Sequence, residues 1–223
     1  MSVTSSAPPV QLVLASASPA RLSVLRAAGT NPVVRVSGVD EDAVGAALTD
    51  PTPAELVAAL AEAKAEAVLA SVAAEFPDSV VIGCDSLLAI TGPDGPEVAG
   101  KPGTVEVARK RWAAMAGGRG DLLTGHTVVR LAGGEPVGRA GAVGRTGVRF
   151  GRPTEAELEA YLGTREPLVV AGAFTLDGLG GWFVEGIDGD AANVIGISLP
   201  LTRSLLAEVG ISVIDLWAPP HAE

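Results

Sequence analysis

"LVLASASPARLSVLRAAG", residues 12–29, joins a short apolar run to a segment with the signals of a helix. The apolar run, residues 10–15, is typical of a buried strand. Ser18 is suited to be the N-cap of the helix, Pro19 its first residue and Gly29 its end. This stretch therefore predicts a strand, a turn and a helix.

The same turn is a candidate anion site. The first amides of a helix lack partners within the helix, and the helix dipole is positive there. Ser16 and Ser18 add hydroxyl groups, and the guanidinium of Arg21 matches the geometry of phosphate oxygens. The alternative is an ordinary capping serine with a solvated arginine, since the glycine-rich GxxxxGK[ST] motif is absent.

Strand-like and helix-like segments alternate along the rest of the chain. Strands are predicted at residues 31–36, at 79–90, and two or three times within 121–150; helices are predicted at 53–74, 105–115, 155–162 and 199–210. Residues 40–42 are expected in a loop, and residues 171–198 are glycine-rich and irregular. Interleaved elements of both kinds predict an α/β fold with a mixed sheet.

Two of the predicted helices have apolar faces that we expect to pack on the core. The face of the first is predicted at Val57, Leu60, Lys64, Ala67 and Val68, and that of the second at Val105, Ala108, Trp112 and Met115. Lys64 thus falls on an apolar face.

Length and charge limit the classes of protein. The 223 residues suit one domain at 10–210, which could comprise two closely joined lobes, with a disordered tail at 1–9 and an extension at 211–223. A formal net charge of -10 argues against a protein that coats nucleic acid or an anionic membrane. The single Cys84 excludes an intrachain disulfide, and no leader or membrane segment is recognisable, so we expect a cytoplasmic protein.

Asp85 is the most informative single residue, because it interrupts the apolar run "VVIGCDSLLAI". A buried carboxylate is costly unless it is paired, binds a metal or faces a cleft. It could serve as a general base or hold a hard cation. The alternative is a carboxylate that caps a neighbouring loop.

Other charged residues allow two interpretations each. Lys64 and Lys101 could contact phosphates, or their stems could lie on the surface with the ammonium in water. The acidic triplet 40–42 could be solvated, or one member could bind Mg²⁺. Two cations, a phosphate-binding turn and acidic ligands together favour a polyphosphate bound with a divalent metal.

Other catalytic patterns are not supported. His126 and His221 are far apart and lie in no zinc-binding pattern, and no GxSxG motif exists. Cys84, a thiol in an apolar run beside a carboxylate, is expected to be buried with a raised pKa.

Seven segments resemble, in order and spacing, the Maf family of nucleotide pyrophosphatases over residues 11–207. They are "LASASPARLSVLRAAG", "VDED", "LAEAKA", "VIGCDSLL", "VAGKPGTVEVAR", "LLTGHTVV" and "AGAFTLDGLGGWFVEGIDGDAANVIGISLPL". The resemblance implies hydrolysis of a nucleoside triphosphate, with standard or modified bases, to a monophosphate and pyrophosphate, with Mg²⁺ or Mn²⁺. It also implies a two-lobed Maf/ITPase-like fold with a long mixed sheet, a deep cleft and a homodimer.

The resemblance also implies residue roles. Asp85, Lys64 and Lys101 are expected to be catalytic; Ser16, Ser18, Arg21, Lys64, Lys101, Ser86 and Asp177 to bind substrate; and Glu41 and Asp85 to bind metal. Ala20, Ser86 and Asp177 depart from the usual residues at positions associated with base choice, and the chain is most similar to the actinobacterial branch. Two other functions remain open: a nucleotide-binding regulator of septum formation and cell division, and a hydrolase of other phosphate compounds such as dinucleotide polyphosphates.

Overall fold

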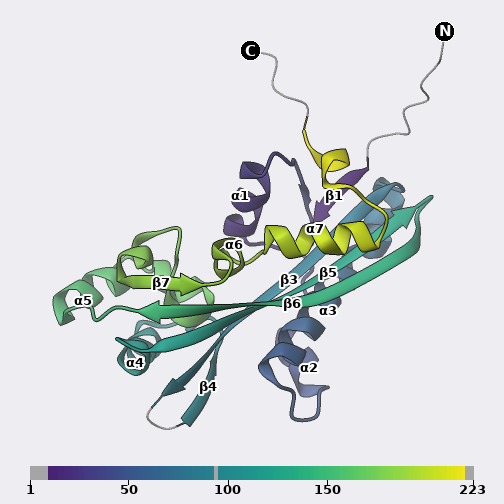
Figure 1. The fold of residues 1–223 in the computed structure, drawn as a ribbon. Coiled ribbons are helices and arrows are strands. Elements are labelled where there is room, and N and C mark those ends of the chain that lie inside the picture. Colours follow the sequence, from purple (N-terminus) through teal and green to yellow (C-terminus); the bar gives the residue numbers. More distant parts are fainter. Residues whose placement is uncertain (1–9, 93–94, 219–223) are drawn as a thin grey trace, which may run out of the picture.

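A computed structural model describes residues 10–92 and 95–218, and Figure 1 shows them arranged around one curled sheet of seven strands. The strand order is β2-β1-β3-β5-β6-β7, with β4 also paired to β3. The strands are β1 Gln11–Leu14, β2 Val33–Val34, β3 Ser79–Gly92, β4 Gly95–Ala99, β5 Arg119–Ala132, β6 Glu135–Phe150 and β7 Val184–Asp188. The predicted α/β class with a mixed sheet is confirmed.

Seven α-helices and four short 3-10 helices flank the sheet in the described part of the chain. The α-helices are α1 Pro19–Ala27, α2 Glu41–Ala46, α3 Pro53–Glu75, α4 Val105–Met115, α5 Glu155–Gly163, α6 Ala191–Ile195 and α7 Leu199–Glu208; the 3-10 helices are η1 Glu166–Val169, η2 Ala171–Ala173, η3 Leu179–Phe183 and η4 Val213–Leu216. None of these helices is both long and apolar enough to cross a membrane.

The long strands β3, β5 and β6 run through two regions with separate cores, which form the two lobes. In one lobe, α3 covers one face of the sheet and α1 and α7 pack on the other. In the other lobe, Trp112 of α4 packs edge-to-face with Phe150, Tyr161 and Phe183, at centroid distances of 6.0, 6.1 and 5.8 Å. The three long strands join the lobes.

One edge of β3 changes its neighbour between the lobes. Residues 79–82 pair in parallel with β1, and residues 88–92 pair antiparallel with β4. Residues 83–87 therefore pair with neither strand along this edge, although β5 pairs with the opposite edge throughout 79–90. The candidate catalytic Asp85 lies in this interval.

Two sequence predictions about helices are wrong in detail. Residues 41–42 lie in a helix, not a loop: the Asp40 side chain accepts a hydrogen bond of 3.0 Å from the amide of Ala43 and caps α2. On α3, Ala67 is exposed, whereas Ala61 and Ala65 are buried against the sheet. The buried face is thus rotated away from Ala67, because Gly83 in β3 admits the α3 backbone closely at Ala61 and Ala65.

Three further elements were not predicted: β4, β7 and α6 lie in stretches rich in glycine or proline, where local pattern favours turns.

At the C-terminal side, Ile211 and Leu216 pack into the core beside α7, and Thr30 forms a β-bridge with Trp217. The predicted tail at 1–9 and the last residues of the predicted extension, 219–223, lie outside the described residues. The predicted domain boundaries remain predictions.

Candidate active site

The candidate site lies where β1 and β4 leave the edge of β3. The turn after β1 brings Ser16 and the start of α1 to this edge, because the Ala15 amide still bonds to the Ile82 carbonyl at 2.8 Å. Asp85 and Ser86 lie in the interval of β3, residues 83–87, that has no partner strand along this edge. A point where neighbouring strands diverge is a usual place for ligand sites in open α/β sheets.

The predicted anion-binding turn is built around a buried arginine. Arg21 is only 9% exposed, so a solvated arginine is the wrong interpretation. Its guanidinium donates from Nη1 to Ser16 Oγ at 3.0 Å, from Nη2 to Ser86 Oγ at 3.0 Å, and from Nε to the Gly196 carbonyl at 2.8 Å. Three of the five N–H groups of the guanidinium are therefore engaged, and the other two have no acceptor among the described residues, so they are available to a ligand.

Both serines of the turn accept backbone hydrogen bonds. Ser18 is the N-cap of α1, and its Oγ accepts from the Arg21 amide at 3.4 Å. Ser16 Oγ accepts from the Ser18 amide at 3.2 Å in addition to Arg21. The turn is therefore rigid around the positive end of the helix dipole.

Lys64 joins the two predicted acidic residues. Its Nζ lies 2.5 Å from Asp85 Oδ1 and 2.6 Å from Glu41 Oε1. The side chains of Lys64 and Asp85 are each 10% exposed, whereas that of Glu41 is 45% exposed. Lys64 of α3 is thus not a lysine with a solvated ammonium, but the cation of a buried ion pair.

Burial and neighbouring charge shift the two carboxyl groups in opposite directions. Burial raises the pKa of Asp85 above its usual value, although the charges of Lys64 and Arg21 partly oppose this rise. Burial also tends to raise the pKa of Glu41, but the hydrogen bond from Lys64 and the charges of Lys64, Lys101 and Arg21 outweigh it and lower the pKa. Asp85 is therefore the carboxyl with the greater tendency to take a proton.

The two halves of the site reach the strand edge from opposite faces of the sheet. Successive residues of a strand point to opposite faces. Asp85 meets Lys64 on the face covered by α3, and Ser86 meets Arg21 on the face of α1 and α6. A ligand at the open edge of β3 could therefore contact both halves.

Close packing of α3 against the sheet brings Lys64 to Asp85. A Cβ on Gly83 would lie 2.2 Å from the Ala61 carbonyl oxygen, and one on Gly125 would lie 2.1 Å from that of Val57. Gly125 pairs directly with Asp85 across β3 and β5. Only glycine at these two positions allows the helix backbone this close.

The other two predicted residues lie on the surface. Lys101 follows β4 in an exposed loop, and its charge contributes to the lowered pKa of Glu41, which places it in the same electrostatic environment. Asp177 is exposed before η3, and its side chain has no hydrogen bond or ion pair within the described ranges. The structure thus joins Ser16, Ser18, Arg21 and Ser86 in one network and Glu41, Lys64 and Asp85 in another.

Sequence reasoning missed a set of buried polar residues behind Ser86. Thr124 Oγ1 lies 2.9 Å from Ser86 Oγ and donates to the Asn193 carbonyl at 3.0 Å. His126 has Nδ1 2.9 Å from the Thr124 carbonyl, and its Nε2 accepts from the Ser198 amide at 2.8 Å. The only signal was the polar residues inside the apolar segment "LLTGHTVV", and local pattern does not show which partners they have.

The carboxylates of Glu41 and Asp85 are a suitable donor pair for a divalent cation. Both have an oxygen within hydrogen-bond distance of one lysine nitrogen, and hard cations such as Mg²⁺ prefer carboxylate oxygens. No larger group of three or more histidine, cysteine or acidic side chains suited to a metal is present in residues 10–92 and 95–218. The protein residues present fit a cation that takes its remaining ligands from phosphate and water.

Cys84 is fully buried, and burial raises the pKa of its thiol to about 11, as expected from the sequence. Its side chain belongs to the core cluster that also contains Ile82 and Leu206. It is therefore a core residue and not a nucleophile.

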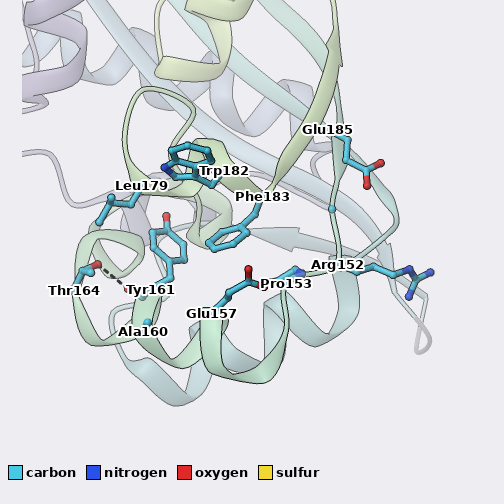
Figure 2. Close-up of a pocket in the computed structure, with 11 residues that line it drawn as sticks. Arg152, Pro153, Glu157, Ala160, Tyr161, Thr164, Leu179, Trp182, Phe183 and Glu185 are labelled. Carbon is cyan, nitrogen blue, oxygen red and sulfur yellow. Dashed lines mark hydrogen bonds between the residues drawn. The ribbon is translucent and has the colours of Figure 1, made fainter.

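A separate cavity of about 560 Å³ lies in the lobe of α5, as Figure 2 shows. Tyr161, Phe183 and the 85% exposed Trp182 line it, with Arg152 and Glu185 among its charged residues. None of the predicted site residues lines this cavity.

Comparisons with known proteins agree with the resemblance. The model of the family described as Maf-like protein matches residues 11–209. A protein of Saccharopolyspora erythraea is 67% identical over 96% of this chain and 100% of its own length. A protein of Rhodococcus jostii is 61% identical over 92% of this chain and 95% of its own length. A protein of Nocardia farcinica is 59% identical over 94% of this chain and 97% of its own length. All three are named nucleoside triphosphate pyrophosphatase. The chain belongs to the Maf-like family.

Proposed function

We propose that the chain is a nucleoside triphosphate pyrophosphatase, which cleaves the bond between the α- and β-phosphates and releases a nucleoside monophosphate and pyrophosphate. The observation that carries this proposal is the buried Asp85–Lys64 pair beside the buried Arg21 at an open strand edge. The names of its relatives support the same reaction.

Asp85 is the proposed general base. Burial raises the pKa of its carboxyl group, which favours acceptance of a proton from water. The resulting hydroxide attacks the α-phosphorus, the bond to the bridging oxygen breaks, and pyrophosphate leaves with the electron pair. Lys64 holds the carboxylate in position, and its charge is available to the phosphates.

The phosphates would lie against the start of α1. The two unengaged N–H groups of Arg21, the hydroxyls of Ser16 and Ser18, and the ammonium of Lys101 are the proposed donors. Pre-oriented donors stabilise the charge that develops on the phosphate oxygens.

Glu41 and Asp85 are the proposed ligands of Mg²⁺ or Mn²⁺. When bound, the cation would neutralise phosphate charge and polarise the reacting phosphoryl group. This neutralisation is needed because the chain has a net charge of -10 and the substrate is itself an anion.

Ser86 and the exposed Asp177 are the proposed contacts for choice of base. A carboxylate at 177 could accept a hydrogen bond from an amino group of a base, so Asp177→Gln should change the order of preferred nucleotides. An unchanged order would remove this residue from the site.

We also propose that the protein is a cytoplasmic homodimer. Light scattering during size-exclusion chromatography tests the dimer, which should have a mass of about twice 22.3 kDa.

The test of the reaction is incubation with Mg²⁺ or Mn²⁺ and a panel of standard and modified nucleoside triphosphates, with pyrophosphate measured separately from orthophosphate. Wild type should release pyrophosphate, and Asp85→Asn should lower kcat at least about 100-fold, as expected for loss of a general base. Nucleotide binding without turnover in wild type would instead favour the regulatory function in cell division. Activity on dinucleotide polyphosphates, without activity on nucleoside triphosphates, would favour a hydrolase of other phosphate compounds.

A further inference from the structure

A chain of hydrogen bonds leads from the candidate phosphate site into the core. It runs from Arg21 Nη2 to Ser86 Oγ at 3.0 Å, from Ser86 Oγ to Thr124 Oγ1 at 2.9 Å, and from Thr124 Oγ1 to the Asn193 carbonyl at 3.0 Å. Thr124 is fully buried, and Asn193 is 1% exposed. The chain thus connects a surface site to α6 through protected groups.

The direction of every hydrogen bond in this chain follows from its two ends. A guanidinium only donates, and a carbonyl only accepts. The Thr124 hydroxyl must use its single proton for the Asn193 carbonyl, so it accepts from Ser86. Ser86 must therefore use its own proton for Thr124 while it accepts from Arg21.

Ser16 and Ser86 consequently differ as partners for a ligand, although both are serines bound to Arg21. Ser16 Oγ accepts two hydrogen bonds, from Arg21 and from the Ser18 amide, and its own proton has no acceptor among the described residues. Ser16 can donate to a phosphate oxygen. Ser86 has no proton to donate and offers only a lone pair.

The far end of the chain is held firmly. Asn193 Nδ2 donates to the Leu122 carbonyl at 3.3 Å and to Thr146 Oγ1 at 3.2 Å, across β5 and β6. Gly144 of β6 leaves space for this side chain, since a Cβ there would lie 2.3 Å from Asn193 Oδ1. The anchored turn of α6 is followed by Gly196, whose carbonyl accepts from Arg21 Nε.

We propose that Thr124 is a positioning residue: through Ser86 it fixes the guanidinium of Arg21 toward the phosphates and restricts Ser86 to accepting a hydrogen bond from the nucleotide. This inference rests on the proposed function. Without the Thr124 hydroxyl, the Ser86 hydroxyl can rotate and donate its proton to another acceptor. The hydrogen bond from Arg21 Nη2 to Ser86 Oγ, one of the three that orient the guanidinium, is then no longer held in place.

The test compares Thr124→Val, which removes the hydroxyl at similar volume in a residue suited to a strand, with Thr124→Ser, which retains it. Thr202→Val is the control, because Thr202 is also buried but its hydroxyl has no partner among the described residues. The readouts are KM and kcat for pyrophosphate release, the Kd of inorganic pyrophosphate by calorimetry, and thermal unfolding.

We expect Thr124→Val to raise KM and the pyrophosphate Kd about tenfold with kcat changed much less, because the lost orientation weakens phosphate binding. Thr124→Ser and Thr202→Val should remain within about twofold of wild type. An unchanged Kd in Thr124→Val, or an equal loss in Thr124→Ser, would overturn the proposal, since the second result indicates packing alone.

A further variant keeps the test decisive. If Thr124→Val does not fold, Ser86→Ala breaks the same chain one step nearer Arg21, and an unchanged pyrophosphate Kd there overturns the proposal. If wild type releases no pyrophosphate from any nucleotide, the proposed reaction fails, but the pyrophosphate titration still decides the role of Thr124.

Discussion

At the scale of single residues, the ion pair of Lys64 and Asp85 dominates the site. Both side chains are nearly buried, and their nitrogen and oxygen lie 2.5 Å apart. Removing one partner of a buried pair leaves an uncompensated charge, whereas replacing both partners costs much less.

Lys64→Met should therefore lower the free energy of unfolding at pH 7 by about 3 kcal/mol, because Asp85 then stays buried without its cation. Adding Asp85→Asn should restore a large part of this loss. Urea unfolding of wild type, both single variants and the double variant measures the coupling. Strictly additive losses would mean that the two groups do not depend on each other.

The residues of the site could be predicted as candidates from the sequence, but their partners could not. A lysine on an apolar helix face and an aspartate in an apolar strand are each unusual in their local pattern. That the two neutralise each other, 21 positions apart, depends on how α3 crosses β3.

At the scale of elements, the position of α3 on the sheet decides whether the site is assembled. Gly83 and Gly125 allow the helix backbone to approach the strands, and a Cβ at either would lie 2.2 Å or less from a backbone oxygen. A backbone atom cannot move aside as the end of a flexible side chain does, so the helix itself would have to shift.

Gly83→Ala or Gly125→Ala should destabilise the protein by about 3 kcal/mol and lower activity, because α3 carries Lys64 away from Asp85 as it moves. Gly163→Ala is the matched control: it lies in α5, and a Cβ there meets nothing within 4 Å. Thermal unfolding and pyrophosphate release measure both effects. If Gly83→Ala and Gly125→Ala changed thermal stability and activity as little as Gly163→Ala does, this account would be contradicted.

Element boundaries were predictable where capping residues mark them. Ser18, Thr52, Thr104 and Thr154 all accept a hydrogen bond from the first turn of their helices. The loop predicted at 40–42 is wrong because Asp40 caps a short helix, α2, that packs against α3. A helix of six residues has too little local pattern to be recognised in isolation.

At the scale of the whole molecule, His126 makes the fold sensitive to acid. Burial lowers its pKa to about 4, and the neutral ring joins β5 to the N-cap of α7 through the Ser198 amide. The ordinary pKa of 6.5 applies in the unfolded chain, which therefore binds more protons than the folded chain between pH 6.5 and 4.

Stability should therefore fall as the pH drops from about 6.5 to about 4, with a contribution from His126 of about 3 kcal/mol at about 1.36 kcal/mol per pKa unit. His126→Gln, which retains a neutral acceptor without a titrating ring, should give a flatter curve over this range. Urea unfolding at several pH values measures the difference. Parallel curves for wild type and variant would exclude His126 as the cause.

The sequence by itself determined the α/β class and the strand, turn and helix at residues 10–29, because these follow from local rules of periodicity and capping. It also supplied the candidate residues, some from their unusual local pattern and others, such as Ser86 and Asp177, from the family resemblance. Only the tertiary structure decided that Arg21 is buried, that Lys64 pairs with Asp85 and that Thr124 supports Ser86. Each of these contacts joins segments distant in the chain. Their geometry depends on the close approach of α3 and on the change of neighbour along β3, which no local pattern encodes.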